Sequence, residues 1–392
     1  MNLIRKNAPV AINRCFEYDY TKIKQVLENQ FNSVIGSADF FRDKNVVLKP
    51  NLLMKASPDK SVTTHPVVME AVIDIIKSYG PRSVKIAESP GGPYNATSLG
   101  IIYRSTGMTA VAEKCGIELN FDTTAEHVSN PDGAVCKVFN IISPIKNADV
   151  IVNMCKLKTH SLTAMSAATK NFFGTIPGIE KFEMHTRFKD LKIFEAMLAD
   201  LCAMHCQRVP VLSVVDAIYG MEGNGPSGGD KRNFGLLLSS LNPFNLDVAC
   251  SSIIGLENEV GYIEEGKKKG ICVLSSNDLT IIGEPLAECK VSDLKLPETK
   301  SLTMLKKLPT FLGGRLNKFF EPRPQIIKKK CVGCGECMRS CPAKTITLVA
   351  YKKGKKIAKI NDENCIKCYC CQELCPINSV KIKKNFIFKI IR

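Results

Sequence analysis

Half of the cysteines of this chain are crowded into one short segment with regular spacing. The sequence has 18 Cys in 392 residues, and nine of them lie between positions 331 and 375. Eight of these nine form two runs of the pattern Cys-x-x-Cys-x-x-Cys-x-x-x-Cys-Pro, which begin at Cys331 and, 34 residues later, at Cys365. Because thiolates at this spacing hold [4Fe–4S] clusters, the segment is predicted to bind two clusters and to handle single electrons.

The fourth cysteine of each run is predicted to serve the cluster of the other run. Three close cysteines on a tight loop can reach three corners of one cubane, whereas the fourth begins a helix, is followed by Pro and points away. The predicted ligands are therefore Cys331, Cys334, Cys337 and Cys375 for cluster 1, and Cys365, Cys368, Cys371 and Cys341 for cluster 2.

Zinc is the alternative cofactor for the eight regularly spaced cysteines. Structural zinc needs a closed set of four ligands, and two complete runs that each end in Cys-Pro favour clusters over zinc.

The remaining cysteines are not predicted to bind a cofactor. Cys370, beside Cys371, is interpreted as a spare or weakly packed thiol. The nine cysteines of residues 1–322 are scattered and are expected to be small buried hydrophobic residues. A disulfide scaffold is disfavoured because the chain is long and shows no export signal.

Residues 325–384 resemble the two-cluster ferredoxin family. The resemblance rests on the two cysteine runs and on the matching Cys-Pro-Ala-Lys-Thr-Ile and Cys-Pro-Ile-Asn-Ser-Val segments that end them. It implies a small α+β domain of two pseudo-symmetric halves, with a hairpin loop at Tyr351 to Lys356 between them. Exposed clusters of this kind are sensitive to oxygen, which suggests an anaerobic or microaerobic cell.

The charge is as uneven as the cysteines. The formal net charge is +16, and the segment from Arg323 to Arg392 alone carries 17 basic and 4 acidic residues. Cluster ligation by thiolates offsets part of this excess. The remainder favours an acidic partner or ligand, and we expect an electron donor or acceptor protein. No nucleic-acid partner is expected, because no helix-turn-helix, zinc-finger or aromatic-interleaved pattern occurs.

The elements that must support these residues alternate between strand and helix. Short apolar runs at 46–48, 84–87, 149–153, 211–215 and 234–239 are predicted strands, and 67–79, 188–205 and 244–254 are predicted helices. This alternation predicts an α/β large domain with a mostly parallel sheet, in which ligands bind beyond the carboxyl ends of the strands. The predicted divisions are 1–44, an N-terminal extension packed on the large domain; 45–290, the α/β domain; 291–324, a linker; and 325–392, the ferredoxin domain.

Two negative observations bear on location. No apolar run reaches eighteen residues, so no membrane-spanning segment is expected, and the N-terminus shows no apolar leader. We therefore expect a cytoplasmic protein. Leu305 to Phe320 is a basic amphipathic stretch that is expected to pack on its own domains, with a membrane surface or a partner as the alternative.

Several polar motifs follow the predicted strands. They are Lys49-Pro50-Asn51-Leu52, Lys156-Leu157-Lys158-Thr159-His160, Lys170-Asn171-Phe172-Phe173-Gly174 and Met221-Glu222-Gly223-Asn224-Gly225-Pro226. On these motifs residues 45–290 resemble the domain of unknown function family 362, which is often fused to a two-cluster ferredoxin. Members commonly carry Asp-Pro where this chain has Asn242-Pro243, which leaves Asp247 as the matching carboxylate.

The polar residues are expected to converge on one cleft that binds an anionic small molecule, since lysines near strand ends suit a carboxylate or phosphate. His65 and His160 are expected to move protons. The predicted catalytic residues are Lys158, His160, Asp216, His65 and Glu88, and the predicted substrate-binding residues are Lys49, Asn51, Lys156, Lys170, Asn171, Asn224 and Asp247.

Each of these residues also has a structural interpretation. Lys49 and Lys170 can be surface charges, His65 can cap its helix, Asp216 can fix the following turn, and Asn224 can tolerate a positive φ. A metal in the large domain is a further alternative, although no compact ligand motif occurs.

The leading hypothesis for function is an iron–sulfur oxidoreductase whose ferredoxin domain passes electrons to an anionic substrate in the α/β domain. The alternatives are a non-enzymatic electron carrier or adaptor that docks on an oxidoreductase, and an iron–sulfur maturation factor.

Overall fold

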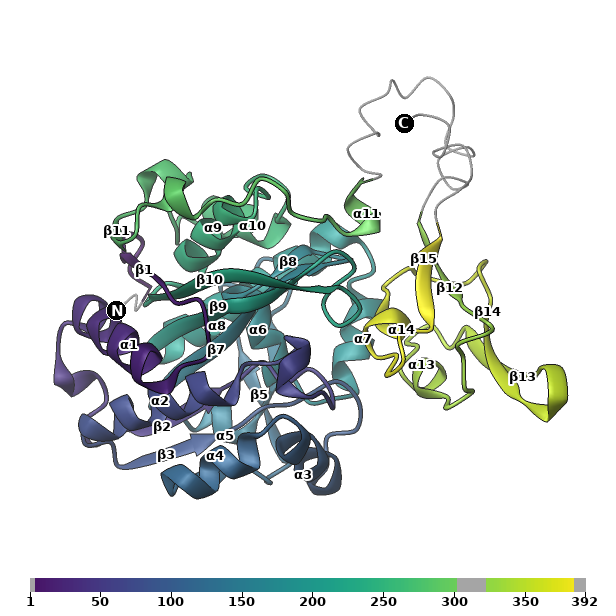
Figure 1. Ribbon diagram of the computed structural model, residues 1–392, viewed down its shortest axis with the longest axis horizontal. Coiled ribbons are helices and arrows are strands. Elements are labelled where there is room, and N and C mark those ends of the chain that lie inside the picture. Colours follow the sequence, from purple (N-terminus) through teal and green to yellow (C-terminus); the bar gives the residue numbers. More distant parts are fainter. Residues whose placement is uncertain (1–3, 302–321, 384–392) are drawn as a thin grey trace.

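The computed structural model describes residues 4–301 and 322–383. Within these ranges the chain forms a large α/β domain and a small C-terminal domain beside it (Figure 1). The basic stretch from Leu305 to Phe320 lies outside the described residues.

The large domain is built on a sheet of nine strands. Eight of them lie in the order β11 (Ile281–Gly283), β1 (Val10–Arg14), β10 (Asp230–Ser240), β9 (Val211–Glu222), β7 (Val150–His160), β2 (Asn45–Lys49), β3 (Ser83–Ile86) and β4 (Glu118–Leu119), and β8 (Ala164–Ser166) pairs with β7. The β4, β3, β2, β7 and β9 strands are parallel, whereas β10 is antiparallel to both of its neighbours. The mostly parallel sheet confirms the predicted fold class.

The strand order reverses between β2 and β7. From β2 the chain crosses to β3 and β4 on one side, and it then returns to place β7 on the other side of β2. In open α/β sheets this reversal leaves a crevice at the carboxyl ends of the two strands, where ligands bind. Lys49, which ends β2, therefore lies at the position where a ligand is expected.

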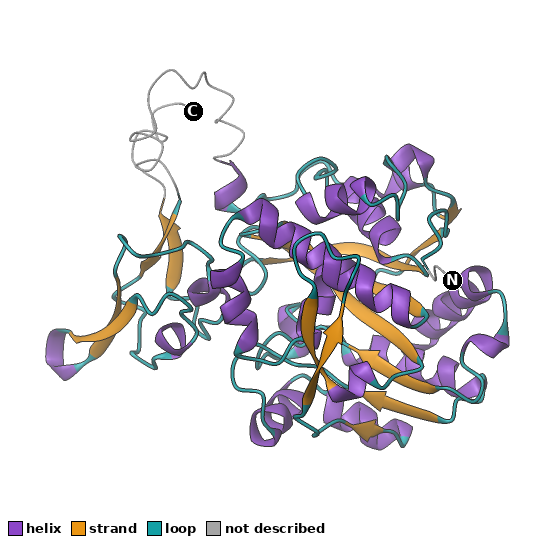
Figure 2. Cartoon of the chain, turned by 180° about the vertical axis from the view of Figure 1, so that it is seen from behind, coloured by secondary structure: helices purple, strands orange, loops and turns teal. Residues whose placement is uncertain are grey.

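Helices cover both faces of the sheet, as Figure 2 shows from behind. One face carries α1 (Tyr20–Ile35), α2 (Pro66–Ser78), α3 (Ala96–Ser105) and α4 (Met108–Cys115). The other carries α6 (Ala168–Asn171), α7 (Glu180–Arg187), α8 (Leu191–Arg208), α9 (Pro243–Ile253) and α10 (Gly261–Lys268). The remaining elements of this domain are a hairpin of β5 (Ala125–Ser129) and β6 (Val138–Ile142), α5 (Ser143–Lys146) and α11 (Glu298–Ser301).

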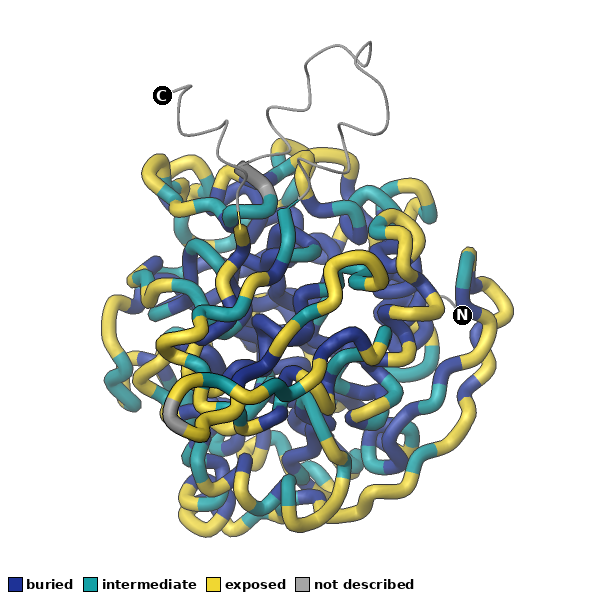
Figure 3. Tube along the Cα trace, turned by 90° about the vertical axis from the view of Figure 1, so that its right-hand side faces the viewer, coloured by how far each residue is buried: buried dark blue, intermediate teal, exposed yellow. Residues whose placement is uncertain are grey.

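The alternation of side chains along β7 explains the two cores. Val150, Val152 and Met154 pack in the core under α1 to α4, whereas Ile151 and Cys155 pack in the core on the opposite face. Because neighbouring residues of a strand point to opposite faces, a run that is apolar throughout is buried on both sides. Figure 3 shows these buried segments in the interior of the molecule, with exposed loops around them.

Two strands extend further than predicted. The Lys156–His160 motif was expected to follow its strand, but β7 continues through His160, and β9 likewise continues from Val211 through Glu222. Both extensions are buried between neighbouring strands, so pairing in the sheet outweighs the local polarity of the residues. The predicted helix at 188–205 begins instead at Leu191, because Asp190 caps it through the amides of residues 192 and 193.

The N-terminal residues are part of the large domain. β1 pairs with β10 and β11, and Leu27 and Phe31 of α1 are fully buried in the core. The nine scattered cysteines are all buried, as their interpretation as small hydrophobic residues requires.

The C-terminal domain has the expected α+β composition. Its antiparallel pairs are β12 (Arg323–Ile326) with β15 (Val380–Lys383) and β13 (Ile346–Ala350) with β14 (Lys356–Ile360), and its helices are α13 (Glu336–Arg339) and α14 (Cys370–Glu373). A 3₁₀ turn, η8 (Lys352–Gly354), lies where the hairpin loop is predicted.

The 34-residue repeat extends to the backbone. Left-handed φ angles occur at Gly333 and Gly335 in the first half, and at Lys367 (56°) and Tyr369 (62°) in the second. Non-glycine residues rarely adopt these angles, so their recurrence at the same offset indicates that both loops are shaped for the same ligand geometry.

Candidate functional site

The carboxyl ends of β2 and β3 place an ion pair at the crevice of the sheet. Lys49 ends β2, Glu88 follows β3, and the two side chains form a buried ion pair. Lys49 Nζ also donates to the Pro50 carbonyl (2.9 Å) and to Asn171 Oδ1 (3.2 Å). Burial raises the pKa of Glu88 to about 7, against the opposing effect of Lys49.

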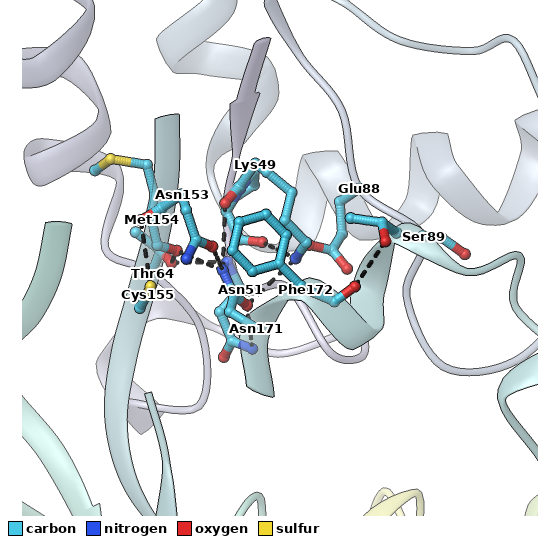
Figure 4. Close-up of polar contacts among 12 residues, drawn as sticks. Lys49, Asn51, Thr64, Glu88, Ser89, Asn153, Met154, Cys155, Asn171 and Phe172 are labelled. Atoms are coloured by element: carbon cyan, nitrogen blue, oxygen red, sulfur yellow. Dashed lines mark hydrogen bonds and ion pairs between the residues drawn. The ribbon is translucent and has the colours of Figure 1, made fainter. Parts of the chain in front are cut away.

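Asn171 connects this ion pair to β7 (Figure 4). Its Nδ2 donates to Asn153 Oδ1 (2.8 Å), and its Oδ1 accepts from Asn51 Nδ2 (3.2 Å). The motif that carries Asn171 requires Gly174, because a Cβ atom there would lie 2.1 Å from Glu88 Oε1. The glycine of the Lys-Asn-x-x-Gly motif therefore allows the backbone to pack closely against the Lys49–Glu88 ion pair.

The Lys156–His160 motif forms the end of β7. Lys158 and His160 point to the same face of the sheet, because they occupy alternate positions of the strand. Lys158 Nζ donates to Asn51 Oδ1 (2.7 Å) and to the Val62 carbonyl (2.8 Å). Burial, with the neighbouring charges of Lys170 and Lys156, holds the pKa of Lys158 well below its usual value.

His160 is a buried, neutral ring that accepts hydrogen bonds through Nδ1. Its Nδ1 accepts from the amides of Leu162 (3.0 Å) and Thr163 (3.3 Å), so the ring hydrogen belongs on Nε2. Nε2 lies 3.2 Å from Glu373 Oε1 of the C-terminal domain. Burial holds the pKa of His160 well below its usual value, so the ring carries no charge at neutral pH.

A pocket between the two domains, which we call the interdomain pocket, is lined by Glu88, Lys158, Asn51 and Asn171 of this set. Lys49 and His160 lie behind these residues and are not part of its lining. The pocket has a volume of about 650 Å³ including its mouth. Its lining residues are Asn51, Leu53, Glu88, Ser89, Pro90, Gly91, Lys158, Ser166, Lys170, Asn171, Phe173, Gly174, Lys181, Phe182, His185, Pro226, Cys370, Glu373 and Leu374. The last three belong to α14 and the residue after it, so the second cysteine run forms one wall of the pocket.

Several hydrogen bonds fix α14 on the large domain. Gln372 Nε2 donates to the Asn224 carbonyl (2.8 Å), and the Ser227 hydroxyl donates to the Glu373 carbonyl. Asn224, predicted to bind substrate, thus contacts the ferredoxin domain through its carbonyl, while its Oδ1 accepts from the Glu298 amide (2.9 Å).

Apolar packing strengthens this contact. Phe182 of α7 packs with Cys370 and Leu374 of the C-terminal domain. Cys370 is 2% exposed, so its interpretation as a weakly packed thiol is wrong.

Three predicted site residues form a separate polar cluster with Tyr18. Lys156 Nζ lies 2.6 Å from the Tyr18 hydroxyl and 2.8 Å from Asp216 Oδ2, and the His65 amide donates to the same carboxylate (3.1 Å). The rings of Tyr18 and His65 stack with their centroids 3.5 Å apart. None of these four residues lines the interdomain pocket, so the predicted residues do not all converge on one cleft.

His65 and Asp247 have structural contacts. His65 caps α2 by accepting from the Val67 amide, and burial lowers its pKa to about 4. Asp247 is fully buried and accepts from the amides of Ala168 (2.7 Å) and Thr169 (2.8 Å) at the start of α6. Asp247 therefore orients the short helix that carries Lys170 and Asn171, without reaching the pocket.

The pocket also contains residues that sequence reasoning missed. Lys181 donates to the Ser89 carbonyl (2.7 Å), the Ser89 hydroxyl (3.0 Å) and the Ile176 carbonyl (2.8 Å), and burial lowers its pKa to about 7. Its neighbour in the pocket, His185, lies four residues along α7. This i, i+4 spacing of basic residues was the available signal, whereas no local signal marked Glu373.

Two further cavities are lined by cysteines of both runs. One is lined by Cys331, Cys334, Cys337 and Cys375, together with backbone of both halves. The other is lined by Cys341, Cys365, Cys368 and Cys371, and also by Cys370. Four thiols around one cavity are the donor set of a [4Fe–4S] cluster, so these residues fit that cofactor.

The fourth cysteines have matching surroundings. Cys375 Sγ accepts from the Ser379 amide (3.1 Å) and lies 3.2 Å from its hydroxyl. Cys341 Sγ accepts from the Thr345 amide (3.3 Å) and lies 3.4 Å from its hydroxyl. Hydrogen bonds to ligand sulfurs tune reduction potential, so both halves carry the same kind of tuning contact.

The fold and the cysteine cavities together define an iron–sulfur protein with a ferredoxin-type electron-transfer domain. A 4Fe–4S dicluster domain model matches residues 330–379. The chain belongs to the domain of unknown function family DUF362, whose model matches residues 46–252, just over half of the chain. Both resemblances inferred from the sequence are thereby confirmed.

Curated relatives divide between the two parts. The chain is 29% identical over 253 residues to the thylakoid-associated protein sll1697 of Synechocystis, covering 63% of this chain and 75% of that protein. The ferredoxin YfhL of Escherichia coli is 33% identical over 64 residues, covering 15% of this chain and 69% of that protein. Subunit I 2 of the NADH-quinone oxidoreductase of Geobacter metallireducens is 38% identical over 64 residues, covering 15% of this chain and 49% of that protein.

Solved structures give more distant likenesses. The lactate racemase apoprotein of Thermoanaerobacterium thermosaccharolyticum aligns with a TM-score of 0.40 and 16% identity, over 64% of this chain and 57% of that one. A Thermotoga maritima protein aligns with a TM-score of 0.37 and 9% identity, over 63% of this chain and 61% of that one. The chain thus spans about three fifths of each of these structures.

Two further features of the described residues concern membranes and metal ions. Across residues 4–301 and 322–383, no helix is long and apolar enough to cross a membrane. In the same ranges, no group of three or more His, Cys, Asp or Glu residues is arranged to hold a single metal ion.

Proposed function

We propose that this protein delivers electrons from two [4Fe–4S] clusters to an anionic small molecule bound in the interdomain pocket. The observation that carries the proposal is the shared wall of that pocket. Cys370 and Glu373, which flank the proposed ligand Cys371, line the same pocket as the ammonium groups of Lys158 and Lys170. An electron-transfer domain and a cation-lined binding site therefore meet at one place.

The cysteine cavities support the crossed arrangement of ligands. Cluster 1 would be held by Cys331, Cys334, Cys337 and Cys375, and cluster 2 by Cys365, Cys368, Cys371 and Cys341. When bound, the clusters supply one-electron reduction, and two of them together can supply a two-electron reduction.

The large domain supplies position and protons. Lys158 and Lys170 bind the anion, and Asp247 orients the turn that carries Lys170. Glu88, with a pKa raised to about 7, exists near neutral pH both as the carboxylate paired with Lys49 and as the acid, so it can pass a proton to a bound substrate. His160 is a positioning residue, because its Nε2 lies 3.2 Å from Glu373 Oε1 and burial disfavours its charged form.

The opposite side of the ferredoxin domain suits an electron donor protein. Cys334 and Val332 of the first loop are exposed, Val332 by 66%, whereas Cys370 and Cys371 of the second loop are buried. Lys328, Lys329 and Lys330 precede the first loop and are exposed, so the donor protein is expected to be acidic there. The exposed loop also suits the alternative function of a non-enzymatic electron carrier. In a carrier, the interdomain pocket would bind no substrate.

The test compares how fast the reduced clusters are reoxidised in the wild-type protein and in a variant that lacks the Lys158 ammonium group. Anaerobically purified full-length protein would be reduced with dithionite, freed of excess reductant and mixed with reducible small anions, including pyruvate, crotonate and nitrite. We expect at least one anion to reoxidise the wild-type clusters, and Lys158→Ala to lose this reaction while it keeps the full iron content. Equal reoxidation in both proteins would contradict the pocket assignment and favour the carrier.

A further inference from the structure

The lysines that line the interdomain pocket, and Lys49 beside it, are not equivalent in their hydrogen bonding. Lys49 and Lys181 each direct three hydrogen bonds to protein acceptors, so their ammonium groups are saturated. Lys158 makes two such bonds, which leaves one N–H. Lys170 is half-buried, and no described residue accepts a hydrogen bond from its Nζ, which lies 5.7 Å from the centre of the Phe173 ring.

The two incompletely bonded ammonium groups lie close enough to oppose each other. Lys170 is the neighbouring charge that most disfavours the charged form of Lys158. Glu373 offsets part of this repulsion, because it favours the charged form of both lysines, but it is one carboxylate for two cations. A ligand that places an oxygen near each ammonium group would offset the rest. The pocket therefore has an anion position between Lys158 and Lys170.

The pocket keeps an excess of positive charge despite its acids. Glu88 is paired with Lys49, and Glu373 lies beside His160 and favours the charged form of Lys170. Two carboxylates thus stand against four lysines, because Lys158 and Lys181 also line the pocket, and a bound anion would offset the excess. The apolar part of the wall, rather than the charge, distinguishes a monoanion from a dianion.

Part of the pocket wall is apolar. Phe173 and Phe182 line the pocket from the large domain and Leu374 lines it from the ferredoxin domain, and all three are buried. Pockets combine such apolar walls with a few placed polar groups when the ligand has an apolar body and one charged end. A phosphate or other simple oxyanion has no part that these walls would cover.

We propose that the interdomain pocket binds a small monocarboxylate, with its carboxylate held between Lys158 and Lys170 and its apolar body against Phe173, Phe182 and Leu374. The proposal rests on the proposed function only in taking this pocket as the ligand site, and it names the substrate class. Since Leu374 follows the second cysteine run, the body of the ligand lies beside the wall formed by the cluster 2 loop.

The test uses isobutyrate, its uncharged analogue isobutyramide, and inorganic phosphate as probes. Binding to the anaerobically purified full chain would be followed by NMR titration of the methyl signals of the probes. We expect isobutyrate to bind about tenfold or more tightly than isobutyramide, because one charge-assisted contact contributes a difference of this order. Excess phosphate should not displace isobutyrate.

Three variants show whether isobutyrate binding depends on a lysine in the pocket or only on the net charge of the protein. Lys170→Met should weaken isobutyrate binding about tenfold or more, Lys170→Arg should keep most of it, and Lys330→Met, an exposed charge at the first loop, should leave it unchanged. Phosphate binding as tight as that of isobutyrate, or an unchanged affinity in Lys170→Met, would overturn the proposal. Carboxylate binding without reoxidation of the reduced clusters would leave it intact and refute the proposed electron delivery instead.

Discussion

The two halves of the ferredoxin domain have the same cysteine spacing but different surroundings. The loop that begins at Cys331 is exposed at Val332 and Cys334, whereas the loop that begins at Cys365 ends in α14, which packs on the large domain. The left-handed backbone positions recur in both loops at an offset of 34 residues. A repeat can therefore duplicate the geometry of a metal-binding loop while its tertiary contacts give one copy a solvent face and the other a pocket.

The largest expected effect concerns the crossed ligands that join the halves. Replacing both Cys331 and Cys375 by Ser should abolish cluster 1 alone and leave about four irons per chain. If each run held its own cluster, the same double variant would damage both clusters. Iron and acid-labile sulfide analysis of anaerobically purified protein decides between these outcomes, and Cys370→Ser, which should keep about eight irons, is the matched control.

The next prediction compares a lysine beside the exposed first loop of the ferredoxin domain with a lysine of the interdomain pocket. Lys330→Glu should slow reduction by an acidic donor such as flavodoxin about tenfold at low ionic strength and should weaken the salt dependence of the rate, because it reverses a charge beside the exposed loop. Reduction by dithionite, followed by stopped-flow absorbance, should stay unchanged.

Lys170→Glu, on the pocket side, serves as the control for this comparison. It should leave reduction by flavodoxin at the wild-type rate. If both variants slowed that reaction equally, the donor would not discriminate between the two sides of the domain.

A smaller effect concerns pH and the buried lysines of the pocket. The pKa of Lys181 is lowered to about 7, below its unfolded value, so the unfolded chain binds more protons between about pH 7 and 10.5. Stability contributed by this group should therefore rise with pH across that window, by at most about 1.4 kcal/mol per unit. In Lys181→Met this rise should be smaller in urea unfolding midpoints but not absent, because burial also lowers the pKa of Lys156, Lys158 and Lys170. Lys330→Met, with an exposed side chain, should retain the full rise.

The smallest expected effect compares the sulfur contacts of the halves. Ser379→Ala removes the hydroxyl 3.2 Å from Cys375 Sγ, and Thr345→Val removes the hydroxyl 3.4 Å from Cys341 Sγ. Each change should lower the reduction potential of one cluster, because hydrogen bonds to sulfur stabilise the reduced form. Redox titration followed by EPR would test whether the shorter contact gives the larger shift in potential. If neither variant shifted the potential of its cluster, the hydroxyls would donate to other acceptors.

Much of the architecture could be predicted from particular residues. The apolar runs before Lys49 and Glu88 predicted parallel strands, and Asp247 was correctly placed on a helix. The strand ends at Lys156 and Asp216 were wrong, because pairing with buried neighbours carries both strands through polar residues that would otherwise mark a loop.

The grouping of the polar residues could not be predicted in the same way. Lys156 and Lys158 are two positions apart on one strand, yet one pairs with Asp216 and Tyr18 and the other faces the interdomain pocket. Their partners lie between 60 and 138 residues away along the chain. Residue type and spacing identified the candidates but contained no information on these pairings.

The sequence by itself determined the chemistry of the cofactor and the class of the fold, because cysteine spacing and the alternation of apolar segments are local properties of the chain. Only the tertiary structure decided which of two equivalent loops meets the large domain, which lysines keep unused N–H groups, and that Glu373 reaches His160. These depend on long-range packing, in which burial and the balance of neighbouring charges act between residues that no local pattern connects.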